Sequence, residues 1–80
     1  MKLPRDVTGN DLAKALVKLG YRLTRQTGSH IRLSKVENGE HHITVPAHNP
    51  LKIGTLAAIL SDLESHHKLP REELLKRLFS

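Results

Sequence analysis

The chain of 80 residues contains no cysteine and no long apolar run. The first absence excludes a disulfide framework and a thiolate metal site, and it is typical of a reducing compartment. The second excludes a membrane-spanning helix, which needs roughly 20 consecutive apolar residues, and residues 1–6 do not resemble a secretion signal. The sequence therefore predicts a soluble, cytoplasmic protein with no membrane partner.

Aromatic residues are almost absent as well. Tyr21 and Phe79 are the only two, and the chain has no tryptophan. Two rings are too few for a platform on which successive bases stack. Any contact with a nucleic acid should therefore run mainly through phosphates and sugars.

Positive charge is abundant and unevenly distributed. Thirteen Lys and Arg against eight Asp and Glu give a net charge of +5. Residues 1–36 hold eight bases and two acids, a balance of +6, whereas residues 37–80 hold five bases and six acids, a balance of −1. A small domain with one basic half is typical of proteins that bind a polyanion, usually a nucleic acid. A solvated basic surface without a partner is the alternative.

Helical patterns occupy the two ends of the chain. Thr8 and Asp11 mark a capped start, apolar residues recur at helical spacing from Leu12, and Gly20 ends the pattern, which predicts a helix over 9–19. A second helix is predicted from Gly54, then a polar link over 64–68. A third helix, with Pro70 in its first position and acids in its first turn, should follow.

Three segments between these helices, 21–26, 30–34 and 41–45, alternate with a period of two, as half-buried strands do. A loop of Glu37, Asn38 and Gly39 joins the second segment to the third, and it pairs apolar residues with each other: Leu33 with Ile43, and Ile31 with Val45. The first hairpin turns around residues 27–29 and should place His30 beside Thr24 or Gln26. In either register His30 shares the polar face with Arg22, Arg32 and Thr44.

The order of these elements predicts one domain over residues 1–80, with a core of about 3–65 and an extension over 66–80. The fold class is α+β: a three-stranded antiparallel sheet with helices on one face, α-β-β-β-α, plus an extra C-terminal helix. The other face of the sheet is left in contact with water.

The six histidines do not form an obvious metal site. Neighbouring residues point apart on a strand and diverge by about 100° on a helix, so the pairs His41-His42 and His66-His67 do not present two rings to one ion. We expect neither a metal nor another cofactor. Ser29 has no acid and base arranged behind it as a catalytic triad requires.

His30 is the candidate catalytic residue. It follows a glycine turn and lies on a face that carries Arg22 and Arg32, with Arg25 nearby. An imidazole can donate or accept a proton near neutral pH, and guanidinium groups hold a phosphodiester and offset charge on phosphorus. Because RNA carries its own nucleophile, the 2′-hydroxyl, this set could cleave RNA without a metal.

The segments LPRDVTGNDLAKALVKLGYRLTRQTGSH and ITVPAHNPLKIGTLAAIL, in that order, resemble the HicA family of toxin–antitoxin ribonucleases. The resemblance covers roughly residues 3–63. It implies a fold like that of double-stranded-RNA-binding domains, an mRNA interferase activity, and inhibition by a HicB-like antitoxin.

The resemblance also implies roles for particular residues. The catalytic histidine of the family corresponds to His30. Gly28 should let the backbone turn tightly and a phosphate come close. Ser29 should orient the imidazole ring or bind a phosphate oxygen. His48 and Lys52 match the VP-x-H and K-x-GT motifs and are expected near the substrate or in the scaffold.

Two alternatives remain open at this point. The first is a non-catalytic RNA-binding module of the double-stranded-RNA-binding-domain type, and the second is a domain whose basic surface meets an acidic protein. Residues 66–80 extend beyond the resemblance, where the extra helix either covers apolar surface, contacts the antitoxin or mediates homo-oligomerisation.

Overall fold

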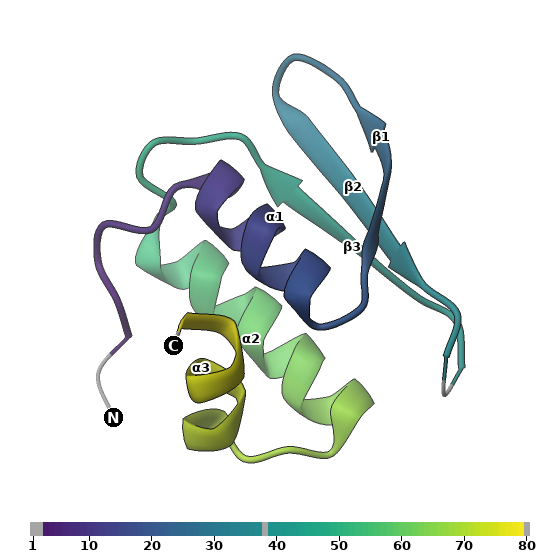
Figure 1. Ribbon diagram of the computed structural model, residues 1–80. Helices are drawn as coiled ribbons and strands as arrows, with labels where there is room; N and C mark the ends of the chain where they lie inside the picture. Colours follow the sequence, from purple (N-terminus) through teal and green to yellow (C-terminus); the bar gives the residue numbers. More distant parts are fainter. Residues whose placement is uncertain (1–2, 38, 80) are drawn as a thin grey trace.

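The computed structural model describes residues 3–37 and 39–79 of the protein. In chain order it contains α1 (Gly9–Lys18), β1 (Arg22–Gln26), β2 (His30–Lys35), β3 (His41–Pro46), α2 (Ile53–His67) and α3 (Arg71–Phe79). The strands form an antiparallel sheet in the order β1-β2-β3, and the helices lie on one side of it (Figure 1). The predicted α+β fold is confirmed. In the described part of the chain, no helix combines the length and apolar character that crossing a bilayer requires.

A capping box starts α1, as the sequence predicts. The Thr8 hydroxyl accepts a hydrogen bond from the backbone N–H of Asp11 at 3.0 Å, and the Asp11 carboxylate accepts one from the N–H of Thr8 at 3.1 Å. Leu19 is the C-cap, and Gly20 then adopts a φ of +101°, a conformation that favours glycine.

The first residue of α1 lies directly against the loop that follows β3. A Cβ added to Gly9 would be 2.1 Å from the carbonyl oxygen of Pro46 and 2.9 Å from the Cα of Ala47. The N–H of Gly9 donates to the carbonyl of His48 at 2.8 Å. Only a glycine lets the start of α1 come this close to the 46–48 loop, so Gly9 fixes where that loop runs.

The register of β2 with β3 matches the prediction. Ile31 pairs with Val45 and Leu33 with Ile43, and all four side chains are buried beneath the helices. β2 ends at Lys35 and β3 begins at His41, so the connection between them spans residues 36–40. Gly39 has the expected positive φ of +98°, whereas the predicted loop residue Asn38 lies outside the described residues.

The register of β1 with β2 differs from the prediction because β1 contains a bulge. Leu23 pairs with Leu33, but the next pair is Arg25 with Arg32, so two residues of β1 stand opposite one residue of β2. Gln26 therefore pairs with Ile31 and joins the helix side of the sheet. The prediction that His30 lies beside Thr24 or Gln26 was wrong.

The core lies between the sheet and the helices, and leucine dominates it. All five residues of β1 are exposed, because β1 is an edge strand that the helices do not cover. Even the apolar Leu23 is 54% exposed to solvent. The sequence had predicted a half-buried strand here. The buried apolar side chains are those of Val7, Leu12, Ala15, Leu16, Tyr21, Ile31, Leu33, Ile43, Val45, Leu51, Leu56, Leu60, Leu63, Leu74, Leu75 and Leu78.

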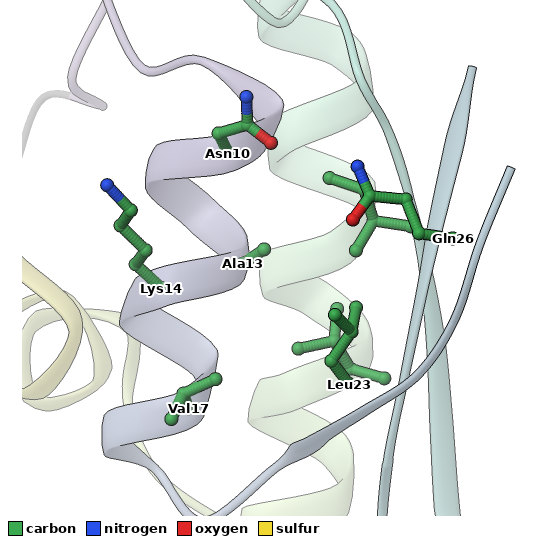
Figure 2. A pocket seen from close by; sticks show the side chains of 8 residues that line it. Asn10, Ala13, Lys14, Val17, Leu23 and Gln26 are labelled. Carbon is green, nitrogen blue, oxygen red and sulfur yellow. The ribbon is translucent and has the colours of Figure 1, made fainter. Parts of the chain in front are cut away.

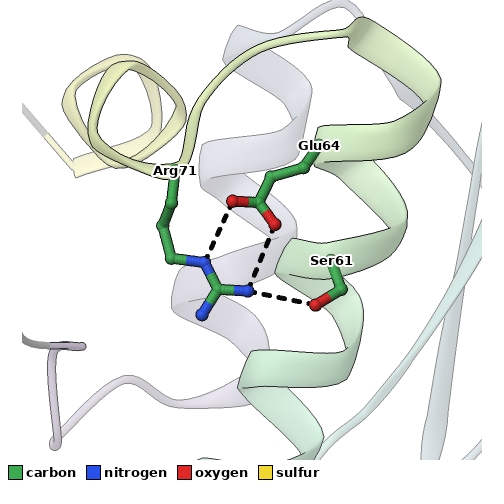
Figure 3. Close-up of polar contacts among 3 residues, drawn as sticks. All are labelled: Ser61, Glu64 and Arg71. Carbon is green, nitrogen blue, oxygen red and sulfur yellow. Dashed lines mark hydrogen bonds and ion pairs between the residues drawn. The ribbon is translucent and has the colours of Figure 1, made fainter.

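The predicted polar link over 64–68 is instead the last turn of α2, which continues to His67 and ends where Lys68 adopts a left-handed φ of 54°. Partners for the polar side chains explain the extra turn. Arg71 at the start of α3 donates to both carboxylate oxygens of Glu64 at 3.2 Å and to the Ser61 hydroxyl at 3.0 Å (Figure 3). This bidentate contact fixes α3 on α2.

The apolar side of α3 faces the interior. Leu74, Leu75 and Leu78 are buried, while Phe79 remains 37% exposed. The helix therefore covers apolar surface of its own chain. Contact with an antitoxin or with a second copy through this helix stays a prediction.

Three histidines and a tyrosine form a cluster that the sequence did not predict. The rings of His41 and His66 are stacked with centroids 4.1 Å apart, and the ring of His67 stands edge-on to that of His66 at 5.0 Å. The Tyr21 hydroxyl lies 2.5 Å from Nδ1 of His41 and 2.9 Å from Nε2 of His67. The cluster connects the start of β3 with the end of α2.

The environment of this cluster favours the neutral forms of His67 and Tyr21. Burial, then the charges of Lys35, His66, His41 and Arg77, lower the pKa of His67 below its usual value. Burial and the Asp62 carboxylate raise the pKa of Tyr21 to about 12. Nε2 of His41 lies 3.2 Å from Asp62, within ion-pair distance but without hydrogen-bond geometry. The folded state therefore favours a neutral His67.

We predict that Gly9→Ala destabilises the protein by about 3 kcal/mol, because the added methyl group forces the 46–48 loop away from α1. Urea denaturation measures the loss. Gly54→Ala is the control, since its Cβ would meet nothing within 4 Å and alanine stabilises a helix by roughly 0.5–1 kcal/mol relative to glycine. Equal stabilities of Gly9→Ala and wild type would contradict the close contact.

We also predict that stability falls as the pH drops. Because the pKa of His67 is lowered in the folded state, the unfolded chain binds the proton first, so stability is full above the unfolded pKa of about 6.5 and is lost as the pH decreases below it. His67→Gln should flatten this dependence between about pH 7.5 and 5.5, measured by urea denaturation, whereas His42→Gln, on the exposed sheet face, should retain it. Parallel pH profiles for wild type and His67→Gln would exclude the cluster as the cause.

Candidate functional site

The face of the sheet opposite the helices carries only polar and charged side chains on β1 and β2. We call it the polar face, and it consists of Arg22, Thr24, Arg25, His30, Arg32, Ser34, His42 and Thr44. The alternation of β2 creates it, because Ile31 and Leu33 point into the core and their neighbours must point away. The predicted sharing of this face by His30, Arg22, Arg32 and Thr44 is confirmed.

His30 is the first residue of β2 and its side chain is exposed. The N–H of Thr27 donates to the carbonyl of His30 at 2.9 Å, which closes a two-residue turn of Gly28 and Ser29. Nδ1 of His30 lies 3.0 Å from the Ser29 hydroxyl. Nε2 has no hydrogen bond to any residue that the structure describes, so this nitrogen faces solvent and can exchange a proton with a bound molecule.

Three arginines share the polar face with this imidazole. Arg32 is two positions along β2 and pairs with Arg25 of β1, which the bulge turns onto this face, and Arg22 lies further along. All three are exposed, and none forms an ion pair within the described part of the chain. Uncompensated guanidinium groups on one surface attract phosphate.

Gly28 does not have the conformational role that the sequence suggested. Its φ lies outside the left-handed region, where only Gly20 and Gly39 are found among the described glycines, and a Cβ at Gly28 would meet nothing within 4 Å. The tight turn therefore does not require a glycine. What the missing side chain leaves is open space next to Ser29 and His30.

The remaining two predicted site residues lie off the polar face. His48 is exposed in the loop after β3, and this loop borders the Gly28–Ser29 turn because Ala47 donates to the carbonyl of Ser29 at 2.9 Å. Lys52 is the N-cap of α2 and contributes no side-chain cap. In Figure 1 the loop carries the chain from the end of β3 to the helix layer. The structure therefore brings His48 near the turn but does not bring Lys52 onto the sheet.

Hydroxyl groups and a second imidazole, which were not predicted as site residues from the sequence, extend the polar face. Nδ1 of His42 lies 2.6 Å from the Ser34 hydroxyl, which is 3.5 Å from that of Thr24, and Nε2 of His42 is 3.5 Å from Glu40. Thr24 and Ser34 also line an open hollow of about 620 Å³ that includes Arg22. Cross-strand pairing of Ser34 with His42, which the predicted register implied, was the available signal.

The polar face offers no metal site. The described residues contain no group of three or more His, Cys, Asp or Glu side chains that could hold a metal ion. What the face does offer is one exposed imidazole held at Nδ1, hydroxyl groups, and three arginines without ion-pair partners among the described residues. This combination suits binding of a phosphate backbone and proton transfer at a bound phosphodiester.

Comparison with known proteins identifies a family. A family model described as the HicA toxin of bacterial toxin–antitoxin systems matches residues 9–64. No curated protein and no solved structure matches the chain. The match spans α1 to most of α2, and thus the whole sheet with His30 and the 46–52 loop, and it ends before α3.

The hydrogen bond between Ser29 and His30 gives a spectroscopic prediction. For Nε2 to accept a proton, Nδ1 must carry the ring proton and donate it to the Ser29 hydroxyl. Ser29→Ala removes that acceptor, so the fraction of the Nδ1–H tautomer should fall, as measured by the imidazole ¹⁵N chemical shifts. Stability should change by less than about 0.5 kcal/mol, because the residue is exposed. Unchanged ¹⁵N shifts would mean that Ser29 does not position the ring.

Proposed function

The chain belongs to the HicA family of toxins of bacterial toxin–antitoxin systems, and we propose that it is an endoribonuclease that cleaves mRNA with His30 as its catalytic residue and without a metal. The observation that carries this proposal is the setting of His30. The ring is exposed on the uncovered face of the sheet, held at Nδ1 by Ser29, with Nε2 facing solvent beside exposed arginines.

The proposed reaction is an internal transesterification. The 2′-oxygen of a ribose attacks the adjacent phosphorus, and Nε2 of His30 takes the 2′-hydroxyl proton. The bond between phosphorus and the 5′-oxygen breaks, and the 5′-oxygen receives a proton from the imidazolium or from water. The products are a 2′,3′-cyclic phosphate and a 5′-hydroxyl end.

Arg32 and Arg25 supply the charge that this reaction needs. Arg32 is two residues from His30 along β2, which corresponds to about 7 Å in a strand, and Arg25 stands opposite Arg32. Guanidinium groups at this distance hold the phosphates that flank the cleavage point and stabilise negative charge on the phosphorane. Arg22 extends the contact to the far end of the polar face.

Gly28, His48 and Lys52 have supporting roles in this proposal. The open space at Gly28 lets a phosphate approach the backbone next to His30. The loop with His48 borders the same turn and contacts the strand as it leaves the sheet. Lys52, at the start of α2, binds a more distant phosphate together with the free N–H groups of the first helical turn.

A HicB-like antitoxin inhibits the toxin in this proposal by covering the polar face. The family match itself implies an antitoxin. Because Arg22, Arg25 and Arg32 have no ion-pair partners among the described residues, an acidic protein surface complements this face and displaces RNA from it.

A non-catalytic RNA-binding module is the second candidate, and one observation favours it. His42, the other imidazole on the polar face, pairs with Ser34, which is four residues from His30 along β2, or about 14 Å. A single phosphodiester cannot contact both rings. His42 therefore cannot assist His30 at the same phosphodiester, and a face with its imidazoles this far apart also suits a module that only binds RNA.

Substitution of His30 separates the two candidates. We expect His30→Ala to lower the rate of mRNA cleavage at least ~100-fold, the range for loss of a general acid–base. The affinity for RNA should change less than about threefold, because phosphate contacts come from the arginines. Gel-based cleavage of a labelled transcript and fluorescence anisotropy measure the two quantities.

His42→Ala is the matched control for this experiment, since it removes an exposed imidazole from the same face, and it should retain most of the cleavage. Cleavage by His30→Ala at the wild-type rate would exclude His30 as the catalytic residue. Lasting inhibition by EDTA, reversed by a divalent cation, would exclude a metal-free reaction.

A further inference from the structure

An apolar groove lies on the helix side of the sheet, between α1 and the hairpin of β1 and β2. It encloses about 320 Å³. Figure 2 shows Ala13 and Val17 projecting from α1 toward Leu23 and Gln26 of β1. The complete lining is Asn10, Ala13, Lys14, Val17, Leu23, Gln26, Ile31 and Leu33.

The groove is open because the helices do not cover β1. Val17 is 53% exposed and Leu23 is 54% exposed, although Ile31 and Leu33 behind them are buried. The bulge contributes by turning Gln26 into the upper end of the groove. Large aliphatic side chains that line a concave surface favour a protein partner, because burying them releases water from apolar surface.

Positive charge lies close to the groove on both elements that form it. Lys14 of α1 lines the groove, while Arg22 and Arg25 lie beside Leu23 on β1 with their side chains on the polar face. None of these three cations forms an ion pair within the described residues, and no carboxylate lines the groove. A complementary partner therefore presents an aliphatic side chain with carboxylates beside it.

The walls suit a protein side chain better than a nucleic acid. Most of them are aliphatic, which gives a charged sugar–phosphate backbone few partners, and they contain no aromatic ring on which a base could stack. A protein partner is already implied by the family, in the form of the antitoxin. We propose that the antitoxin inserts an aliphatic side chain, flanked by acidic residues, into the groove between α1 and β1. The inference rests on the toxin–antitoxin assignment and is independent of the chemistry at His30.

The groove also explains how the antitoxin is held over the polar face. Leu23 points to the groove side of β1, while Arg22 and Arg25 point to the polar face. A partner that grips the exposed edge of β1 contacts both sides of the strand. The groove then supplies affinity by burial, and the polar face is blocked by the same bound molecule.

Single substitutions in the groove test the proposal without touching the polar face. Val17→Asp and Leu23→Asp place a carboxylate where the partner brings an aliphatic side chain and acids. Each should weaken the affinity for the antitoxin, purified from its complex with this chain, at least about tenfold. Val17→Lys should weaken it too, because burial and not only charge is lost.

Ile53→Asp is the control, since Ile53 is 45% exposed and lies outside both the groove and the polar face. Its affinity for the antitoxin should remain within about twofold of wild type. Calorimetric titration gives the affinities, and circular dichroism confirms that each variant is folded. Groove variants that bind the antitoxin as tightly as the Ile53→Asp control would overturn the proposal.

Growth assays distinguish this proposal from the proposed nuclease activity. Cells that express Val17→Asp should stop growing even when the antitoxin is present, because the variant keeps its activity but binds the antitoxin weakly. Charge reversal at Arg22 and Arg32 should instead weaken the binding of both RNA and antitoxin. If His30→Ala still arrests growth, the assignment of His30 is wrong while the groove result stands. If Val17→Asp instead converts a toxin dimer to a monomer and leaves antitoxin affinity unchanged, the groove binds a second copy and the proposal is wrong.

Discussion

The alternation of side chains along β2 is the constraint on which the rest of the structure depends. Ile31 and Leu33 are buried against the helices, and their pairing with Val45 and Ile43 fixes the register of the central strand. A shift by one residue would exchange the two faces. The burial of two aliphatic side chains therefore presents His30 and Arg32 to solvent, without any contact made by the imidazole itself.

Much of this could be predicted from the sequence because the responsible signals are local. The capping pair at Thr8 and Asp11, the positive φ at Gly20 and the alternation around Ile31 each depend on a few adjacent residues. The bulge in β1 was not predictable in this way. Periodicity assumes one residue opposite one residue, and the extra residue at Thr24 is detectable only when β2 is in place.

The same distinction applies to the candidate site. The polar face and the exposed position of His30 follow from alternation, but the contact of Ser34 with His42 needs the third strand beside the second. The Tyr21 cluster was even less predictable from the sequence, because His41 and His66 are 25 positions apart in the chain and come into contact only when β3 and α2 pack together. Their proximity also explains why α2 extends past the predicted end, since its last turn carries rings that have partners.

The bulge in β1 has a further consequence, for self-association. β1 is an unprotected strand with five exposed residues at the margin of the sheet, and a regular strand of this kind recruits strands from other molecules and promotes aggregation. The irregular spacing at Thr24 interrupts the row of backbone donors and acceptors, and the arginines on either side repel another copy of the same strand. The protein can thus leave this margin accessible to a partner of opposite charge while discouraging copies of itself from adding to it.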